Sequence, residues 1–94
     1  MNVFEIAKVG GKHSGFLKNY MGRSADEINK AINTLETGKR GINTHLDKLA
    51  NPSKYVPDWN ILRPSHQQGL IKGWQKEILN GREQIQILRG LLGN

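Results

Sequence analysis

The stretch that decides the fold begins Ser24-Ala25-Asp26-Glu27-Ile28 and runs to Asn51-Pro52. A serine followed three residues later by a glutamate is typical of a capping box, so we expect a helix to begin at Ser24. Behind it, apolar residues alternate at spacings of three and four, which places them in one stripe along a helix. The stripe consists of Ile28, Ile32, Leu35, Ile42, Leu46 and Leu49, with Lys39 at its one polar step. Asn51-Pro52 should end the helix, because the residue before a proline disfavours helical torsions.

Two glycines, Gly38 and Gly41, interrupt this stripe. Each weakens a helix interior by about 1 kcal/mol relative to alanine. Two alternatives follow: one long helix with a soft middle, or two collinear helices broken between Gly38 and Gly41.

A second amphipathic segment follows a link that contains all three prolines of the chain, residues 51–64. The aromatic and aliphatic side chains of the link predict an ordered connection. Ser65-His66-Gln67-Gln68 behind Pro64 is interpreted as another capping box. The stripe that follows consists of Ile71, Trp74, Ile78, Gly81, Ile85, Leu88 and Leu92.

Two helices with matching stripes and a short link should fold back as an antiparallel hairpin. In the expected register Leu35 lies opposite Gly81. Each stripe stays half covered, so the N-terminal segment, with a short helix in which Phe16 and Tyr20 share a face, is expected to pack on the hairpin together with the link. Residues 1–10 are a short helix, a short strand or the remnant of a linker, and the helix is favoured. The sequence therefore predicts one all-α domain over residues 1–94.

The chain of 94 residues carries a formal charge of +6, with a sequence pI near 9.9 and no cysteine. The positive charge favours nucleic acid or an acidic protein as partner. Without cysteine there is no disulfide, thiolate nucleophile or thiolate metal site. No apolar run reaches the length of a membrane span, so we expect no stable membrane association.

Several enzyme classes lack their motifs in this sequence. The three histidines have no short ligand spacing, so no metal site and no cofactor is expected. The segment Gly10-Gly11-Lys12-His13-Ser14 is too short and wrongly ordered for a phosphate-binding loop. Neither a G-x-S-x-G nucleophile elbow nor a paired carboxylate typical of glycosidases is found.

Metal-independent cleavage of RNA remains, and it needs few groups. Histidine can take the proton from the ribose 2′-hydroxyl or give one to the leaving 5′-oxygen, because its pKa lies near neutrality. A lysine can offset the charge that develops on phosphorus. We therefore predict His13 and His45 as an acid–base pair that faces a common cleft, with Lys12 beside them. The alternatives are an exposed loop residue for His13 and a histidine packed at a helix interface for His45.

Residues expected to contact the substrate carry polar or stacking groups near these positions. They are Ser14, Lys18, Asn19, Asp47, Lys48 and Trp59. For Trp59, the alternative to stacking on a base is a plug over the end of the hairpin. His66, in the first turn of the second long helix, is interpreted as a surface residue.

Three parts of the sequence together resemble a known group of proteins. They are Gly11-Lys12-His13-Ser14-Gly15-Phe16-Leu17-Lys18-Asn19-Tyr20, then His45-Leu46-Asp47-Lys48-Leu49-Ala50-Asn51-Pro52 with Tyr55, Pro57 and Trp59, and finally Trp74 with Glu77-Ile78. The group is the C-terminal toxin domains of bacterial polymorphic toxins, which end contact-dependent growth-inhibition, Rhs-type and filamentous-haemagglutinin-like exoproteins. The resemblance covers most of the chain from Gly11 onward.

This resemblance implies an effector that is delivered from a secreted or cell-surface exoprotein into the cytoplasm of a neighbouring bacterium. It also implies a cognate immunity protein, for which the basic charge predicts an acidic surface. Many such toxins are ribonucleases that act on tRNA, and others are DNases. We carry over only the segments around His13 and His45 as site positions. The alternatives to a ribonuclease are a metal-dependent DNase and a non-enzymatic basic module that binds nucleic acid or protein.

Overall fold

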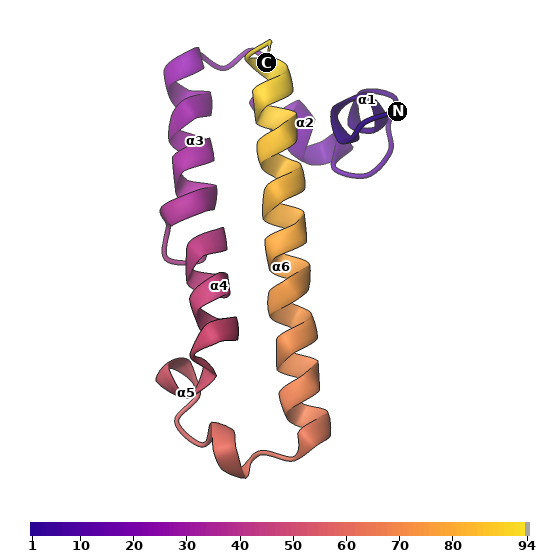
Figure 1. Cartoon of the computed structure of the whole chain (residues 1–94). Coiled ribbons are helices and arrows are strands. Elements are labelled where there is room, and N and C mark those ends of the chain that lie inside the picture. The colour runs from indigo at the N-terminus through magenta and orange to yellow at the C-terminus, as the bar shows by residue number, and fades with distance from the viewer. Residues whose placement is uncertain (94) are drawn as a thin grey trace.

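The computed structural model describes residues 1–93 and is all-α over that range, as predicted. Its elements, in chain order, are α1 (Val3–Lys8), α2 (Ser14–Tyr20), α3 (Ala25–Thr37), α4 (Ile42–Ala50), α5 (Pro52–Tyr55), the 3-10 turn η1 (Trp59–Ile61) and α6 (Pro64–Leu91). Figure 1 shows α3 and α4 stacked end to end along one side of the long α6, with α1 and α2 at the opposite side of its C-terminal end.

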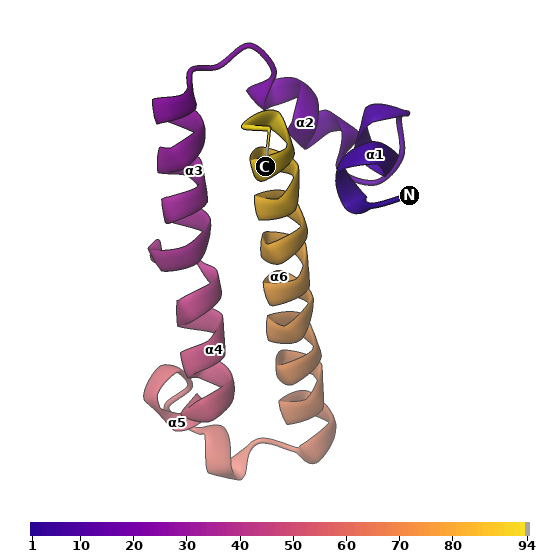
Figure 2. The same ribbon diagram turned by 45° about the horizontal axis from the view of Figure 1, so that its top comes forward.

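The hairpin of α3 and α4 against α6 sets the shape of the molecule, which the turned view in Figure 2 also displays. Its principal extents are 48 × 25 × 18 Å, and its radius of gyration is 15.8 Å. A compact domain of this length would have a radius of gyration of about 12 Å. The elongated hairpin leaves much of α6 open on the flanks that α3 and α4 do not cover.

The helix predicted from Ser24 begins there and is broken in its middle. The Ser24 hydroxyl accepts a hydrogen bond of 3.2 Å from the backbone N–H of Glu27. Of the two alternatives, the structure contains the broken helix, which ends at Thr37 and restarts at Ile42. A Cβ atom on Gly38 would lie 2.5 Å from the Thr34 carbonyl oxygen, and one on Gly41 would lie 2.9 Å from that of Leu35. Both positions require glycine, because the backbone at the break passes too close to these carbonyl oxygens to leave room for a Cβ atom.

The predicted register of the hairpin is wrong by one heptad. Ile42, not Leu35, lies against Gly81, where an added Cβ atom would be 3.0 Å from the Cγ1 atom of Ile42. Ile42 forms a buried cluster with Ile78 and Ile85. A stripe that repeats every seven residues allows both registers. The chain turns back later than expected because the link coils into α5 and η1 beyond the end of α4.

The prediction of a second capping box at Ser65 is also wrong. Helix α6 begins at Pro64, with Arg63 at the N-cap position and no side-chain cap. A proline suits the first helical position because it lacks the N–H that would stay unpaired there. Gln67 instead donates a hydrogen bond of 2.6 Å to the carbonyl oxygen of Trp59, which holds η1 against α6.

The N-terminal residues form a helix, α1, and pack on α6 together with α2. Ala7 and Leu17 make a buried cluster with Ile87, whose side chain is fully buried. Phe16 and Tyr20 share a face as predicted, with ring centroids 4.9 Å apart. This cluster fixes the loop between α1 and α2 beside the C-terminal third of α6.

Candidate functional site

The loop that carries Lys12 and His13 is held by a pair of backbone hydrogen bonds at the end of α1. Gly10, at a φ of 93°, donates to Ala7, and Gly11 donates to Ile6. This is the Schellman arrangement, which uses a glycine for its left-handed residue. A Cβ atom on Gly11 would lie 2.9 Å from the Ile6 carbonyl oxygen, so the chain can turn this tightly only at glycine.

His13 follows in a backbone conformation that few residues other than glycine adopt. It is the N-cap residue of α2, at φ 69° and ψ 14°, in the left-handed region. Its Nε2 atom lies 2.9 Å from the Oε1 atom of Glu83 on α6, and the two residues are 70 positions apart in the chain. The same oxygen accepts from the Nζ atom of Lys12, also at 2.9 Å. The exposed fraction of the His13 side chain is 11%.

Glu83 is the carboxylate that organises this loop. Its hydrogen bonds from Lys12 and, next, from His13 hold the pKa of the Glu83 carboxyl below its usual range, against the opposing effect of partial burial. Glu83 is therefore ionised near neutral pH and can only accept, so the Nε2–H group of His13 donates. When the ring is neutral, its Nδ1 atom is left as the basic nitrogen.

A polar cleft of about 180 Å³ lies beside His13, between α6 and the junction of α3 with α4. It is lined by His13, Leu35, Arg40, Ile42, Glu77, Asn80, Gly81 and Gln84. Arg40 forms no ion pair with any residue from 1 to 93. The cleft thus brings an imidazole, a guanidinium and two side-chain amides together.

His45 is buried in α4 and does not line this cleft. Its Nδ1–H group donates a hydrogen bond of 2.9 Å to the carbonyl oxygen of Gly41, one turn back in the same helix. The expected common cleft for His13 and His45 is not found, because the hydrogen bond to Gly41 draws the His45 ring against its own helix.

Asp47 and Lys48 contact α5 instead of the histidines. The Asp47 carboxylate accepts hydrogen bonds from Lys54, Tyr55 and Asn51. These bonds, led by the one from Lys54, lower the pKa of Asp47 to about 2. The Lys48 ammonium lies 5.7 Å from the centroid of the Tyr55 ring. Both predicted substrate-binding residues therefore clamp α5 onto the end of α4.

The remaining predicted residues are spread over three environments. Ser14 is half-buried at the start of α2, next to His13, whereas Lys18 and Asn19 are exposed on the same helix. The Asn19 carbonyl oxygen accepts a hydrogen bond from Arg23. Trp59 is buried and stacks on Trp74, with ring centroids 5.7 Å apart, so it plugs the end of the hairpin and its ring is not free to stack on a base.

Two other features, a metal site and a membrane-spanning helix, are absent from the part of the chain that the structure describes. Residues 1–93 contain no cluster of three or more histidine, aspartate or glutamate side chains suited to hold a metal ion. In the same range, no helix combines the length and the apolarity needed to cross a bilayer.

Sequence reasoning missed Glu83, Gln84 and Asn80. Glu83 is a charged residue off the apolar stripe of α6, and such residues ordinarily face solvent. Its pairing with His13 depends on how α2 docks on α6, and no local pattern encodes that docking. Arg40 belongs to no motif in the sequence and directly precedes Gly41, at the break between α3 and α4.

Comparison with known proteins gives no match: no family model, curated protein or solved structure is significantly similar to this chain. The site must therefore be interpreted from its own geometry.

Proposed function

We propose that this chain is a metal-independent ribonuclease that serves as the toxin domain of a bacterial polymorphic toxin. One observation carries the proposal: His13 donates its Nε2–H to an ionised carboxylate at the edge of a cleft that also holds Arg40. A carboxylate that orients an imidazole in this way leaves the other ring nitrogen ready to move a proton.

In this proposal the Nδ1 atom of His13 removes the proton of a ribose 2′-hydroxyl. The 2′-oxygen then forms a bond to phosphorus, and the bond from phosphorus to the 5′-oxygen breaks. A water molecule gives the leaving oxygen its proton, because His45 is buried and does not line the cleft. Arg40 and Lys12 offset the negative charge that develops on the phosphate oxygens.

Charge supports a nucleic-acid substrate and an acidic inhibitor. The net charge of +6 attracts polyanions. Within the cleft the cation is Arg40, and Glu77 is a carboxylate in the same lining. We propose tRNA as the substrate and an acidic immunity protein as the partner that protects the producing cell. Delivery into the cytoplasm of a neighbouring bacterium, from the end of a secreted or cell-surface exoprotein, belongs to the same proposal.

Incubation of the purified chain with total bacterial RNA tests the activity. We expect discrete tRNA-sized fragments that persist in EDTA, because neither proton transfer nor charge stabilisation needs a divalent ion here. His13→Ala should lower the cleavage rate by about a hundredfold or more, as expected for loss of a general base. His45→Ala, at a buried position outside the cleft, should lower the rate much less. Both variants should keep a helical circular-dichroism spectrum.

The matched control is His66→Ala, because His66 is exposed in the first turn of α6, far along the chain from the cleft. It should cleave at the wild-type rate. Full activity in His13→Ala would refute the assignment of the general base. A loss in His45→Ala as large as that in His13→Ala would restore His45 as the general acid. Cleavage of DNA that EDTA abolishes would favour the metal-dependent DNase, and binding of RNA without cleavage would favour the non-enzymatic module.

A further inference from the structure

A row of polar side chains runs along α6 on the flank away from the His13 cleft. We call Arg82, Gln86 and Arg89 the arginine ridge. They lie at positions i, i+4 and i+7, which fall on one helix face. All three are exposed, and neither arginine forms an ion pair with any residue from 1 to 93. At 1.5 Å per residue, the two arginines are about 10 Å apart along the axis.

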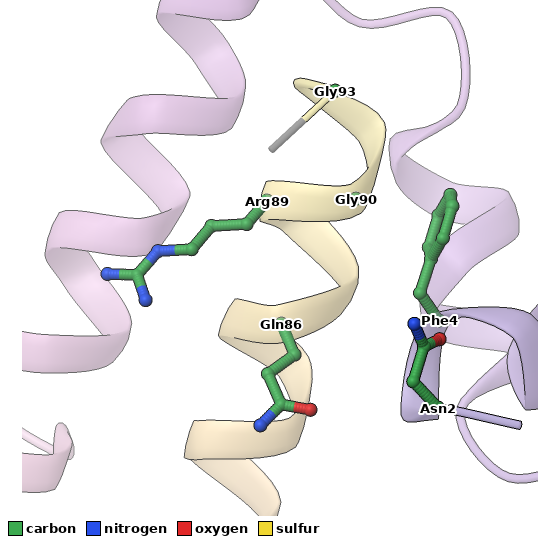
Figure 3. Close-up of a pocket in the computed structure, with 6 residues that line it drawn as sticks. All are labelled: Asn2, Phe4, Gln86, Arg89, Gly90 and Gly93. Atoms are coloured by element: carbon green, nitrogen blue, oxygen red, sulfur yellow. The ribbon is translucent and has the colours of Figure 1, made fainter.

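The ridge stands between two surface hollows and lines both. One, of about 510 Å³, lies towards α1 and is lined by Asn2, Phe4, Gln86, Arg89, Gly90 and Gly93. In Figure 3 the side chains of Asn2 and Gln86 lie on either side of this hollow, while Arg89 extends from α6 away from α1. The other, of about 370 Å³, lies towards α4 and includes Asn43, Glu36 and all three residues of the ridge.

The two hollows are separate from the His13 cleft. The α6 residues that line the cleft are Glu77, Asn80, Gly81 and Gln84, and none of them lines either hollow. The packed contact of Ile42 on Gly81 lies between the two flanks. A ligand on the ridge therefore occupies its own surface, and only a ligand wider than the helix can touch both.

We propose that the arginine ridge binds the sugar–phosphate backbone of the RNA substrate, so that the enzyme acts on long or folded RNA and poorly on short oligonucleotides. Arginine guanidinium groups and the amides of asparagine and glutamine are the groups that usually contact phosphate and sugar oxygens. A spacing of about 10 Å spans some three nucleotides of a stacked strand at 3.4 Å each. A helix is about 10–12 Å wide with its side chains, so one folded RNA can reach both flanks of α6.

Glu36 is the one carboxylate among the residues that line the two hollows. Its charge opposes a phosphate on the α4 side of the ridge. Glu36→Gln should therefore tighten RNA binding, whereas loss of the arginines should weaken it.

The identity of the ligand as RNA rests on the proposed function, but binding can be measured without cleavage. In a His13→Gly background, fluorescence anisotropy of a labelled tRNA would be recorded over a range of salt concentrations. R82Q/R89Q should weaken binding about tenfold. It should also reduce the slope of log K against log salt by about 1.4–1.8, since each phosphate contact contributes about 0.7–0.9. Glu36→Gln should strengthen binding.

The matched control is K72Q/K76Q, which removes the same two charges from exposed positions of the same helix. It should change the affinity by less than about threefold and leave the slope nearly unchanged. Equal losses in the two double variants, or no loss in R82Q/R89Q, would overturn the proposal. In the latter case an acidic protein surface would become the better candidate for the ridge.

Cleavage of a dinucleotide separates this inference from the proposed function. With His13 intact, R82Q/R89Q should cut a dinucleotide at the wild-type rate and tRNA about tenfold more slowly at low RNA concentration. A wild-type chain that cuts neither substrate would refute the proposed ribonuclease activity. The anisotropy measurement would still show whether the arginine ridge binds RNA. If R82Q/R89Q slowed cleavage of the dinucleotide and of tRNA equally, RNA binding by the arginine ridge would be refuted, and the proposed ribonuclease activity would stand.

Discussion

His13 combines an uncommon backbone conformation with a contact that spans the chain. A non-glycine residue in the left-handed region is strained by about 1–2 kcal/mol, although histidine is among the residues that enter it more often. The hydrogen bond to Glu83 uses this conformation to aim the ring at α6. Strain of this kind is found where a side chain must be positioned for function.

Replacement of His13 by glycine and by alanine separates the backbone from the side chain. Both variants lose the contact with Glu83, but glycine adopts the left-handed torsions without strain. We expect His13→Gly to be more stable than His13→Ala by about 0.5–1 kcal/mol, the strain of alanine less the extra freedom of unfolded glycine. Urea unfolding followed by circular dichroism measures the difference. Equal stabilities would mean that residue 13 leaves the left-handed region when the imidazole is removed.

Asp47 makes the stability of the α4–α5 junction depend on pH. Hydrogen bonds, first from Lys54, lower its pKa from 3.8 to about 2 in the folded chain. A lowered pKa stabilises the fold above the unfolded value, and the contribution is lost as pH falls through the folded value. Asp47→Asn should therefore be less stable than the wild type at neutral pH. The gap should close between about pH 3.8 and pH 2, as thermal unfolding at a series of pH values would reveal. A gap that is constant down to pH 2 would contradict the assignment.

Helix α6 contains glycines with opposite environments along its length. Gly90 lies under the ring of Phe4, where a Cβ atom would be 2.5 Å from the nearest ring carbon, whereas nothing lies within 4 Å of one at Gly73. Both glycines have helical torsions, so they differ chiefly in the side chains that contact them. Gly90 is thus a contact surface for α1, and Gly73 only weakens the helix.

Alanine at these positions should therefore have effects of opposite sign. Gly90→Ala should lower the free energy of unfolding by about 1–3 kcal/mol, because Phe4 must move and α1 with it. Gly73→Ala should raise it by up to about 1 kcal/mol, from helix propensity alone. Chemical denaturation of the two variants beside the wild type tests both signs. A stabilising Gly90→Ala would show that α1 is not packed on α6 in solution.

The molecule as a whole has two clusters of buried aliphatic side chains along α6, besides the Trp59–Trp74 stack at the end of the hairpin. One is the cluster of Ala7, Leu17 and Ile87, and the other is that of Ile42, Ile78 and Ile85. Ile87 and Leu88 are the largest side chains with essentially no exposure. The N-terminal cluster positions His13, so its packing links the stability of the fold to the geometry of the site.

Isoleucine-to-valine changes measure this interior with little disturbance. Ile87→Val should lower the free energy of unfolding by about 0.5–1.5 kcal/mol, because it leaves a small void in a fully buried position. Ile61→Val is the matched control, since Ile61 is 82% exposed, and it should stay within about 0.5 kcal/mol of the wild type. If Ile87→Val and Ile61→Val changed the free energy of unfolding equally in denaturant, Ile87 would not be part of the buried interior.

Much of the fold could be predicted from the sequence because the signals are local. The capping box at Ser24, the two apolar stripes and the interruption by Gly38 and Gly41 each act within a few residues. The first stripe is confirmed except at Leu46, which is 41% exposed while His45 beside it is buried. The predicted start of α6 was wrong because the helix begins at Pro64, which suits the first helical position, and not after an N-cap at Ser65. The register was wrong because a heptad stripe packs nearly as well when it is shifted by seven residues.

For the candidate site, the chain itself specified the residue types, and the packing decided which of them meet. A histidine and a lysine between glycines are visible in the sequence, as is a basic surface. The contact of His13 with Glu83 and the burial of Trp59 depend on how α2 and η1 dock on α6. The physical reason is range: helix signals act over three or four residues, whereas docking joins residues 70 positions apart through surfaces that exist only once the helices have formed.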